Sequence, residues 1–150
     1  MSERARLNLP ERIQGMLDGS VPPAPIAKLI GFKVVSVASG KAVIEFEAGE
    51  KHANPMGTLH GGMLCDISDA AMGLAYASRL NEGESFTTLE LKINFLKPIR
   101  KAKLRVEGYV VNEPRTVGLV MCDVFDEQEK LIARASSTCM TLRGEQAEGR

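Results

Sequence analysis

The feature that most constrains this 150-residue chain is one long stretch, from Gly61 to about Leu80, that lacks proline and is rich in alanine, methionine and leucine. Such a stretch predicts a single main α-helix. The rest of the chain indicates strands, two before the helix at about 32–37 and 43–47, and four after it at 86–96, 102–112, 116–126 and 131–142. One helix cannot cover both faces of a six-stranded sheet, so a doubly wound parallel fold is excluded. The order predicts an α+β protein in which an antiparallel sheet of about six strands wraps around one central helix.

The segments that flank this unit are short. Residues 9–18 have a proline near the start and apolar residues at helical spacing, which predicts a short helix before the proline-rich stretch that follows. We therefore expect an N-terminal arm at 1–24, one globular domain at 25–143, and a polar, frayed tail at 144–150.

Composition limits the classes of function. Nineteen basic residues balance nineteen acidic ones, so no overall charge attracts nucleic acid or an anionic membrane. There is no apolar run of eighteen residues, and the N-terminus lacks the apolar core of a signal peptide. The three cysteines, Cys65, Cys122 and Cys139, lie in apolar patterns and predict buried free thiols, with a reactive thiol as the less favoured reading. We expect a soluble cytoplasmic protein that binds neither nucleic acid nor membranes.

The predicted helix is apolar on most of its sides. The stripe that would face the sheet carries Leu64, Ile67, Ala71, Leu74 and Ala75. Much of the remaining surface carries Met63, Ala70, Met72, Tyr76 and Ala77. A helix that is apolar all round is buried all round, which one sheet in a domain of this size cannot achieve. We expect a second copy of the chain to supply the missing cover.

Polar groups nevertheless collect where this helix begins, because residues 54–69 read N-P-M-G-T-L-H-G-G-M-L-C-D-I-S-D. Asp69 lies opposite the sheet-facing stripe and beyond the first turn, so it needs either water or a polar partner. Asp66 lies nearer the helix start, where acidic residues commonly stabilise the dipole. Gly61 and Gly62 offer backbone N–H groups that can hold a developing oxyanion, although paired glycines before a helix often mark only a turn.

Neither Asn54 nor His60 is diagnostic alone, since both are common structural residues of loops. An amide, an imidazole, backbone donors and a carboxylate within sixteen residues together indicate a functional site. The histidines and aspartates lack the H-x-x-x-H or H-E-x-x-H spacing of a metal site, so we expect neither a metal nor a cofactor. A nucleophile elbow, a P-loop and Rossmann glycines are also missing.

This constellation resembles the hotdog-fold acyl-CoA thioesterases, in particular the phenylacetate-pathway branch that includes human thioesterase superfamily member 2. The resemblance runs from about Ile30 to Leu142. It rests on N-P-M-G-T-L-H-G-G with an Asp nine residues after the His, on T-L-E-L-K-I-N-F-L-K-P at 88–98, and on K-L-I-A-R-A-S-S-T at 130–138. It implies a hotdog fold and a homodimer with joined sheets, often paired into a homotetramer. It also implies an active site at the dimer interface, with the Asn54–His60 loop from one chain and the helix carboxylate from the other.

The resemblance also implies a role for each matching residue. Asp69 would activate water or attack the thioester carbonyl itself, while Asn54 and the Gly61 N–H would polarise that carbonyl. His60 would shape the loop. Thr88 falls, one residue out of register, where the human enzyme has a serine that helps to hold the water, and Thr87 is its neighbour.

The substrate implied is an acyl- or aryl-acyl-CoA. Its phosphates would be met by basic residues at the turns, although such residues are commonly just solvated: Lys97, Arg100, Lys101, Lys103 and Arg115. Gly62 and Met63 would lie against the substrate. The acyl pocket would draw on Met56, Leu59, Met63, Met72 and Phe95.

Two other functions are compatible with the same fold. A hotdog hydratase or dehydratase would use a histidine with an acidic residue, but the N-x-x-G-x-x-H-G-G context is unlike that branch. A non-catalytic acyl-CoA sensor usually carries a DNA-binding domain, for which the residues before Gly31 are too few and too rich in proline. Asp69 also favours catalysis.

Overall fold

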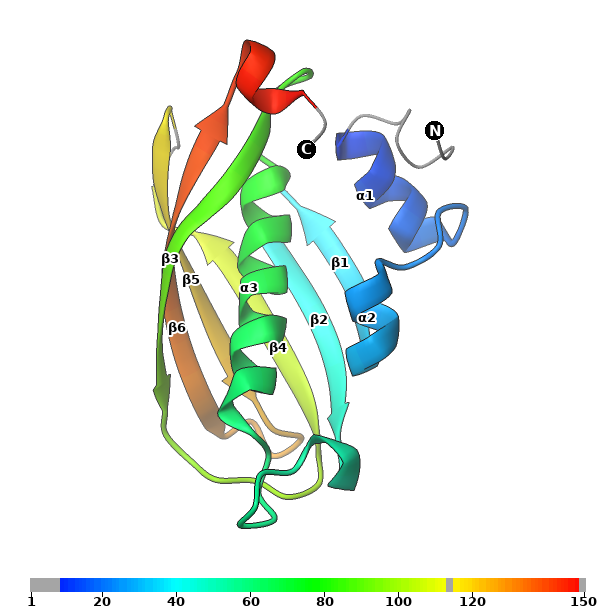
Figure 1. Cartoon of the computed structure of the whole chain (residues 1–150), viewed down its shortest axis with the longest axis vertical. Coiled ribbons are helices and arrows are strands. Elements are labelled where there is room, and N and C mark those ends of the chain that lie inside the picture. The colour runs from blue at the N-terminus through cyan, green and yellow to red at the C-terminus, as the bar shows by residue number, and fades with distance from the viewer. Residues whose placement is uncertain (1–8, 113–114, 149–150) are drawn as a thin grey trace.

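The computed structural model describes residues 9–112 and 115–148 of the chain (Figure 1). Its helices are α1 (Leu9–Asp18), α2 (Pro25–Ile30) and α3 (Gly61–Ala77), with 3-10 turns η2 (Glu50–His52) and η3 (Gly144–Ala147). Its strands are β1 (Phe32–Ala38), β2 (Lys41–Ala48), β3 (Ser85–Phe95), β4 (Ala102–Val110), β5 (Val117–Phe125) and β6 (Leu131–Leu142).

The six strands form one sheet in the order β1-β2-β4-β5-β6-β3, and every neighbouring pair is antiparallel. Strand β3, which follows the long helix, crosses to the far edge of the sheet and pairs with β6. Figure 1 shows the sheet curling around α3, with α1 and α2 on the side of β1. The predicted sheet around one central helix is therefore confirmed.

The helix packs most closely on β4, in the middle of the sheet. A Cβ atom at Gly108 would lie 2.4 Å from the carbonyl oxygen of Ala71, so only a glycine permits this approach. Below the helix, the inward positions of β4 are fully or almost fully buried. At the far end of α3, the buried Tyr76 hydroxyl hydrogen-bonds the Thr141 hydroxyl at 2.8 Å, which satisfies both groups.

Helix α3 ends at Ala77, earlier than the predicted Leu80, because Ser78 forms competing hydrogen bonds. Its hydroxyl donates to the Ala75 carbonyl at 2.7 Å and accepts the N–H of Gly40 at 2.7 Å. Ser39 and Gly40 have φ values of 49° and 82°. This is the two-residue hairpin turn predicted between the first two strands.

The prediction that a second copy of the chain covers the rest of α3 is partly wrong. Met72, Tyr76 and Ala77 are 0%, 0% and 2% exposed within the single chain. The curled sheet and the N-terminal arm bury these residues, so they do not call for a second copy. The surface of α3 that stays open is narrower and includes the exposed Asp66 and Asp69.

The two ends of the chain differ from each other. Helix α1 forms at 9–18 as predicted, and its Ile13 is buried. Residues 144–147 of the expected polar tail form the 3-10 turn η3, which has no buried residue, while 149–150 lie outside the described residues. Among the described helices, none has the length and apolar character needed to cross a membrane.

The cysteines are free, as expected, but only Cys122 and Cys139 are buried, while Cys65 is half-buried. Burial raises the pKa of the Cys122 thiol to about 12 and raises that of Cys139. For Cys65, burial and then the nearby Asp66 charge raise the thiol pKa. Because the thiolate is the reactive form, these shifts disfavour thiol chemistry.

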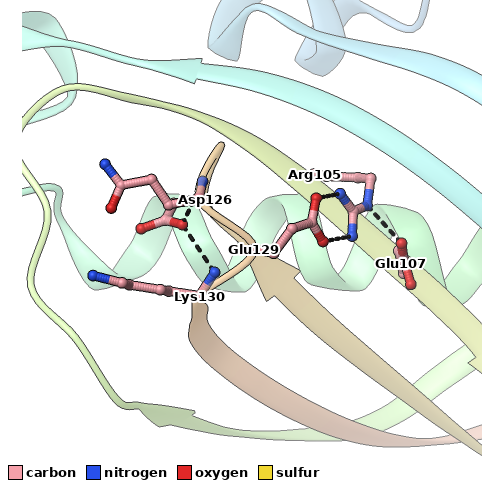
Figure 2. Close-up of polar contacts among 6 residues, drawn as sticks. Arg105, Glu107, Asp126, Glu129 and Lys130 are labelled. Carbon is pink, nitrogen blue, oxygen red and sulfur yellow. Dashed lines mark hydrogen bonds and ion pairs between the residues drawn. The ribbon is translucent and has the colours of Figure 1, made fainter.

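The turn between β5 and β6 is closed by a network of charged groups (Figure 2). Asp126 Oδ1 accepts the backbone N–H groups of Gln128 and Lys130, each at 2.9 Å. The N–H of Lys130 is the main reason why the pKa of Asp126 lies below its ordinary value. Beside it, the Arg105 guanidinium makes two hydrogen bonds to Glu129, at 2.5 and 2.6 Å. These contacts connect β4 to the turn between β5 and β6.

Candidate active site

The loop before α3 is shaped by the side chain of Asn54. Its Oδ1 accepts the N–H groups of Met56 at 3.0 Å and Thr58 at 3.2 Å, and its Nδ2 donates to Thr58 Oγ1 at 2.9 Å. The Arg100 guanidinium braces the same loop by donating to the Gly57 carbonyl at 3.0 Å. An amide nitrogen carries two N–H groups, so Asn54 keeps one for a ligand while it closes the loop.

His60 caps α3 with its ring. Its Nδ1 accepts the N–H of Gly62 at 2.9 Å, so in the neutral imidazole Nε2 carries the proton. The Gly62 donor is thereby used inside the chain. The Gly61 N–H makes no hydrogen bond to any residue in 9–112 or 115–148. Of the two glycine donors predicted for an oxyanion, only that of Gly61 is free.

Phe95 lies directly over Gly61. A Cβ atom at Gly61 would be 2.8 Å from the Phe95 ring, although that ring is 55% exposed and can shift. The absence of a side chain thus leaves the helix start open beside an aromatic ring.

Asp69 is held by Thr88 of β3. The Thr88 hydroxyl donates to Asp69 Oδ1 at 3.1 Å, across a sequence separation of 19 residues. A register shift between Thr88 and Glu90 marks a β-bulge beside this contact. Bulges often re-aim side chains next to active sites. Thr87 points to the opposite face of the strand by alternation, so the structure brings Thr88, and not Thr87, to the carboxylate.

The two halves of the constellation open into different pockets of the chain. Asn54, Gly61 and Phe95 line a pocket of about 340 Å³ next to the Pro98 turn. Asp69 and Thr88 line a separate pocket of about 590 Å³ between α3 and the N-terminal arm. Gly61 and Asp69 are eight residues apart, which is ~12 Å along a helix. One chain alone therefore keeps the free donor away from the carboxylate.

The basic residues near the Pro98 turn have different partners. Lys97 pairs with the buried Asp126 at 3.1 Å, whereas Lys101 pairs with the exposed Glu50 at 2.9 Å. Lys103 is exposed. Lys97 lines the pocket next to the Asn54 loop and Arg100 donates to that loop, whereas Lys101 lies against η2 and Lys103 lies within β4.

Arg115 is separated from that group. It belongs to the β4–β5 turn, which Figure 1 shows at the opposite end of the sheet from the β3–β4 connection. Its carbonyl accepts a hydrogen bond from the Arg143 guanidinium. A single chain does not bring Arg115 to the other basic residues.

The residues expected to line the acyl pocket do not form one pocket in the chain. Met72 is wholly buried in the core, Met56 is 71% exposed, and Leu59 and Phe95 line the smaller pocket. Met63 is half-buried near the helix start. The larger pocket is instead walled by the N-terminal arm and α2, through Leu9, Met16, Val21, Ala24, Ile26 and Ala27. The apolar residues at helical spacing in 9–17 predicted a short helix. That spacing could also have indicated that one face of this helix lines a pocket.

The described residues contain no group of three or more His, Cys, Asp and Glu side chains placed to hold a metal ion. Near α3, His60 lies at the end of the loop, whereas Asp66 and Asp69 lie on the helix.

Known proteins share this sequence and fold. The family model of the thioesterase superfamily matches residues 56–133. A Saccharolobus solfataricus protein assigned to the esterases is 36% identical over 118 residues, covering 79% of this chain and 84% of that protein. Human acyl-coenzyme A thioesterase 13 is 28% identical over 109 residues, covering 70% of this chain and 76% of the human protein.

A solved structure is also similar to this chain. The phenylacetic acid degradation-related protein of Ralstonia eutropha is similar with a TM-score of 0.78 and 29% identity, covering 86% of this chain and 98% of that one. The resemblance seen in the N-P-M-G-T-L-H-G-G segment is therefore confirmed. The chain belongs to the thioesterase superfamily and is a thioester hydrolase with the hotdog fold.

Proposed function

We propose that the protein hydrolyses the thioester bond of an acyl- or aryl-acyl-CoA to CoA and a carboxylic acid, with Asp69 as the catalytic carboxylate. The observation that carries this proposal is the Thr88 hydrogen bond to Asp69, at the edge of a large pocket lined mainly by apolar side chains. A carboxylate held in one orientation beside space for an acyl group suits attack on a thioester carbonyl. The name of the human relative, an acyl-coenzyme A thioesterase, supports CoA as the thiol.

The chemistry follows from these groups. Asp69 accepts a proton from water as the water oxygen bonds to the thioester carbon, or it attacks that carbon itself and water then cleaves the anhydride. The carbonyl oxygen becomes an oxyanion, which the Gly61 N–H and the remaining N–H of Asn54 stabilise. The carbon–sulfur bond then breaks, and the CoA thiolate leaves and takes up a proton. His60 keeps Gly61 in place through its cap on Gly62, and water is the only co-reactant, so no cofactor is proposed.

The proposed site needs two copies of the chain, because one chain separates Gly61 from Asp69. Strand β3 is an edge of the sheet, and Leu89 and Phe95 on it, with Leu96 just after it, are 52%, 55% and 55% exposed. An unpaired edge with apolar side chains is a surface on which a second strand can add. We propose a homodimer in which the loop of one copy faces Asp69 of the other, and we expect such dimers to pair into a tetramer.

Basic side chains near the Asn54 loop can receive the CoA phosphates. Arg100 already lies against that loop, and Lys101 is 70% exposed in its pair with Glu50, itself 87% exposed. An ion pair so exposed contributes little, so Lys101 can exchange Glu50 for a phosphate. Lys97 is less available because Asp126 holds it, and Arg115 can take part only from another copy. The cytoplasmic location and the absence of nucleic-acid or membrane partners stay predictions.

A panel of acyl-CoA thioesters, followed with a thiol reagent, tests the function. Release of free CoA supports hydrolysis, binding without release favours the acyl-CoA sensor, and addition of water to an enoyl-CoA with the thioester intact favours the hydratase. In Asp69→Asn we expect turnover to fall by about 10²-fold or more, the scale of a general base. Asp66→Asn is the matched control, since it removes an exposed carboxylate one turn earlier. Near-normal turnover in Asp69→Asn would overturn the assignment.

A further inference from the structure

The pocket beside Asp69 has the shape of a trough along α3. Asp69, Gly73 and Ala77 follow one another at single-turn spacing and all line it, with Ala70 and Leu74 beside them. From Asp69 to Ala77 this floor is eight residues long, or ~12 Å. Its volume of about 590 Å³ lies within the range of small-molecule sites.

The N-terminal arm forms the roof of this trough. Leu9, Arg12 and Met16 all line it, and their spacing of three and four residues places them on one face of α1. Figure 1 shows α1 near the level of the C-terminal end of α3 and α2 further down, and α1 contacts α3, whereas α2 contacts β1. The α1 part of the roof therefore lies at the end of the trough far from Asp69.

Arg12 is the exception on an otherwise apolar wall. Among the described residues that line the trough, the other basic one is Lys33, an exposed strand residue between the inward-facing Phe32 and Val34. Arg12 is half-buried and makes no hydrogen bond or ion pair with any residue in the described ranges. A guanidinium on an apolar wall is most stable when an acceptor replaces the water it loses.

We propose that the trough binds the acyl group of the substrate, and that Arg12 binds a carboxylate at the distal end of that group. This rests on the proposed function, because the trough is filled from the end where Asp69 would meet the thioester. The small side chains of the floor leave room for an apolar chain, and the two charged ends fit an acyl group with a thioester at one end and an anion at the other. The substrate class is an ω-carboxyacyl thioester.

The test compares suberyl-CoA, which carries a terminal carboxylate, with octanoyl-CoA, which has the same chain length and ends in a methyl group. The quantity measured is the ratio of kcat/KM for the two substrates. Both values come from one enzyme preparation, so the ratio does not depend on the active fraction. We expect the wild-type protein to prefer suberyl-CoA, and Arg12→Met to reduce the ratio by about tenfold or more, the scale of a hydrogen bond to a charged group. Arg12→Lys should retain part of the preference.

Lys28→Met is the matched control, because it removes one positive charge from an exposed position of α2, which follows the arm, outside the trough. Its ratio should equal that of the wild type. The inference is overturned if the wild type does not prefer suberyl-CoA, or if Arg12→Met and Lys28→Met change the ratio equally. In either outcome, hydrolysis of octanoyl-CoA by the wild type would still support the proposed function. If the wild type turns over neither these nor any other thioester, the proposed function fails and this inference fails with it.

Discussion

The loop at the N-terminus of α3 is held by several hydrogen bonds. The Asn54 side chain makes three of them within the loop, His60 caps Gly62, and Arg100 donates to the Gly57 carbonyl. Two turns further along, the exposed Asp69 carboxylate accepts a hydrogen bond from the Thr88 hydroxyl and lies beside small apolar side chains. An oxyanion donor must be in place before charge develops, and so a rigid loop suits it. A carboxylate that must meet both water and varied acyl groups needs access. We infer that the loop determines the rate and the trough determines which substrate is used.

The largest effect that sharpens this comparison is expected at Gly61. Gly61→Pro removes the free N–H at the first helical position, where proline is well tolerated. His60, with φ −64° and ψ 131°, already has the conformation preferred before proline. We expect kcat to fall by about 10²–10³-fold, the cost of one oxyanion donor.

Gly61→Ala is the control for this substitution, because it adds the same Cβ atom beneath Phe95 and keeps the N–H. If the alanine and proline variants lose activity equally, the contact with Phe95 explains the loss and the donor role is wrong.

A smaller effect is expected at Thr88. Thr88→Val keeps the shape of the side chain and its suitability for a strand, but removes the hydroxyl that orients Asp69. We expect kcat to fall by about tenfold, the lower end for a hydrogen bond to a charged group, since the pair is accessible to water. Thr87→Val, on the opposite face of β3, should have little effect. Equal losses in the two variants would show that the strand matters and the hydroxyl does not.

The smallest effect on turnover is expected for Asp126→Asn in the β5–β6 turn, which lies away from both halves of the site. The backbone N–H of Lys130 and the ammonium group of Lys97 lower the pKa of Asp126 in the folded chain. The charged form therefore adds stability above the unfolded carboxyl pKa of about 3.9, and this is lost as the pH falls through the folded value. Asp126→Asn should lower the Tm at neutral pH, and the difference should vanish in acid. A pH series of thermal unfolding curves measures it, and a difference that persists in acid would contradict this account.

The sequence could predict the features that depend on neighbouring residues, but not those that depend on tertiary contacts. Local rules gave the sheet around one helix, the Ser39-Gly40 turn and the glycine pair at the helix start, because each depends on neighbouring residues. The contact between Thr88 and Asp69 depends on a β-bulge, and the use of the Gly62 N–H depends on the rotamer of His60, so neither could be derived from spacing.

The N-terminal arm was underestimated for a similar reason. Its apolar stripe predicted a helix, but only the packing of α1 on β1 and α3 makes it the roof of a pocket. The same packing buries Ala77, which had been assigned to a partner's cover. The curl of the sheet and the position of the arm are long-range features that a periodic pattern does not contain.

The central claim is that each catalytic site takes its donor from one copy and its carboxylate from another. Co-expression of Asp69→Asn and Gly61→Pro chains with different affinity tags allows mixed dimers to be purified. Each mixed dimer then contains one complete site and one site with both defects, so we expect about half of the wild-type activity. Each variant alone should be nearly inactive. Mixed dimers as inactive as the two parents would show that both groups must act from the same chain, which would contradict the account.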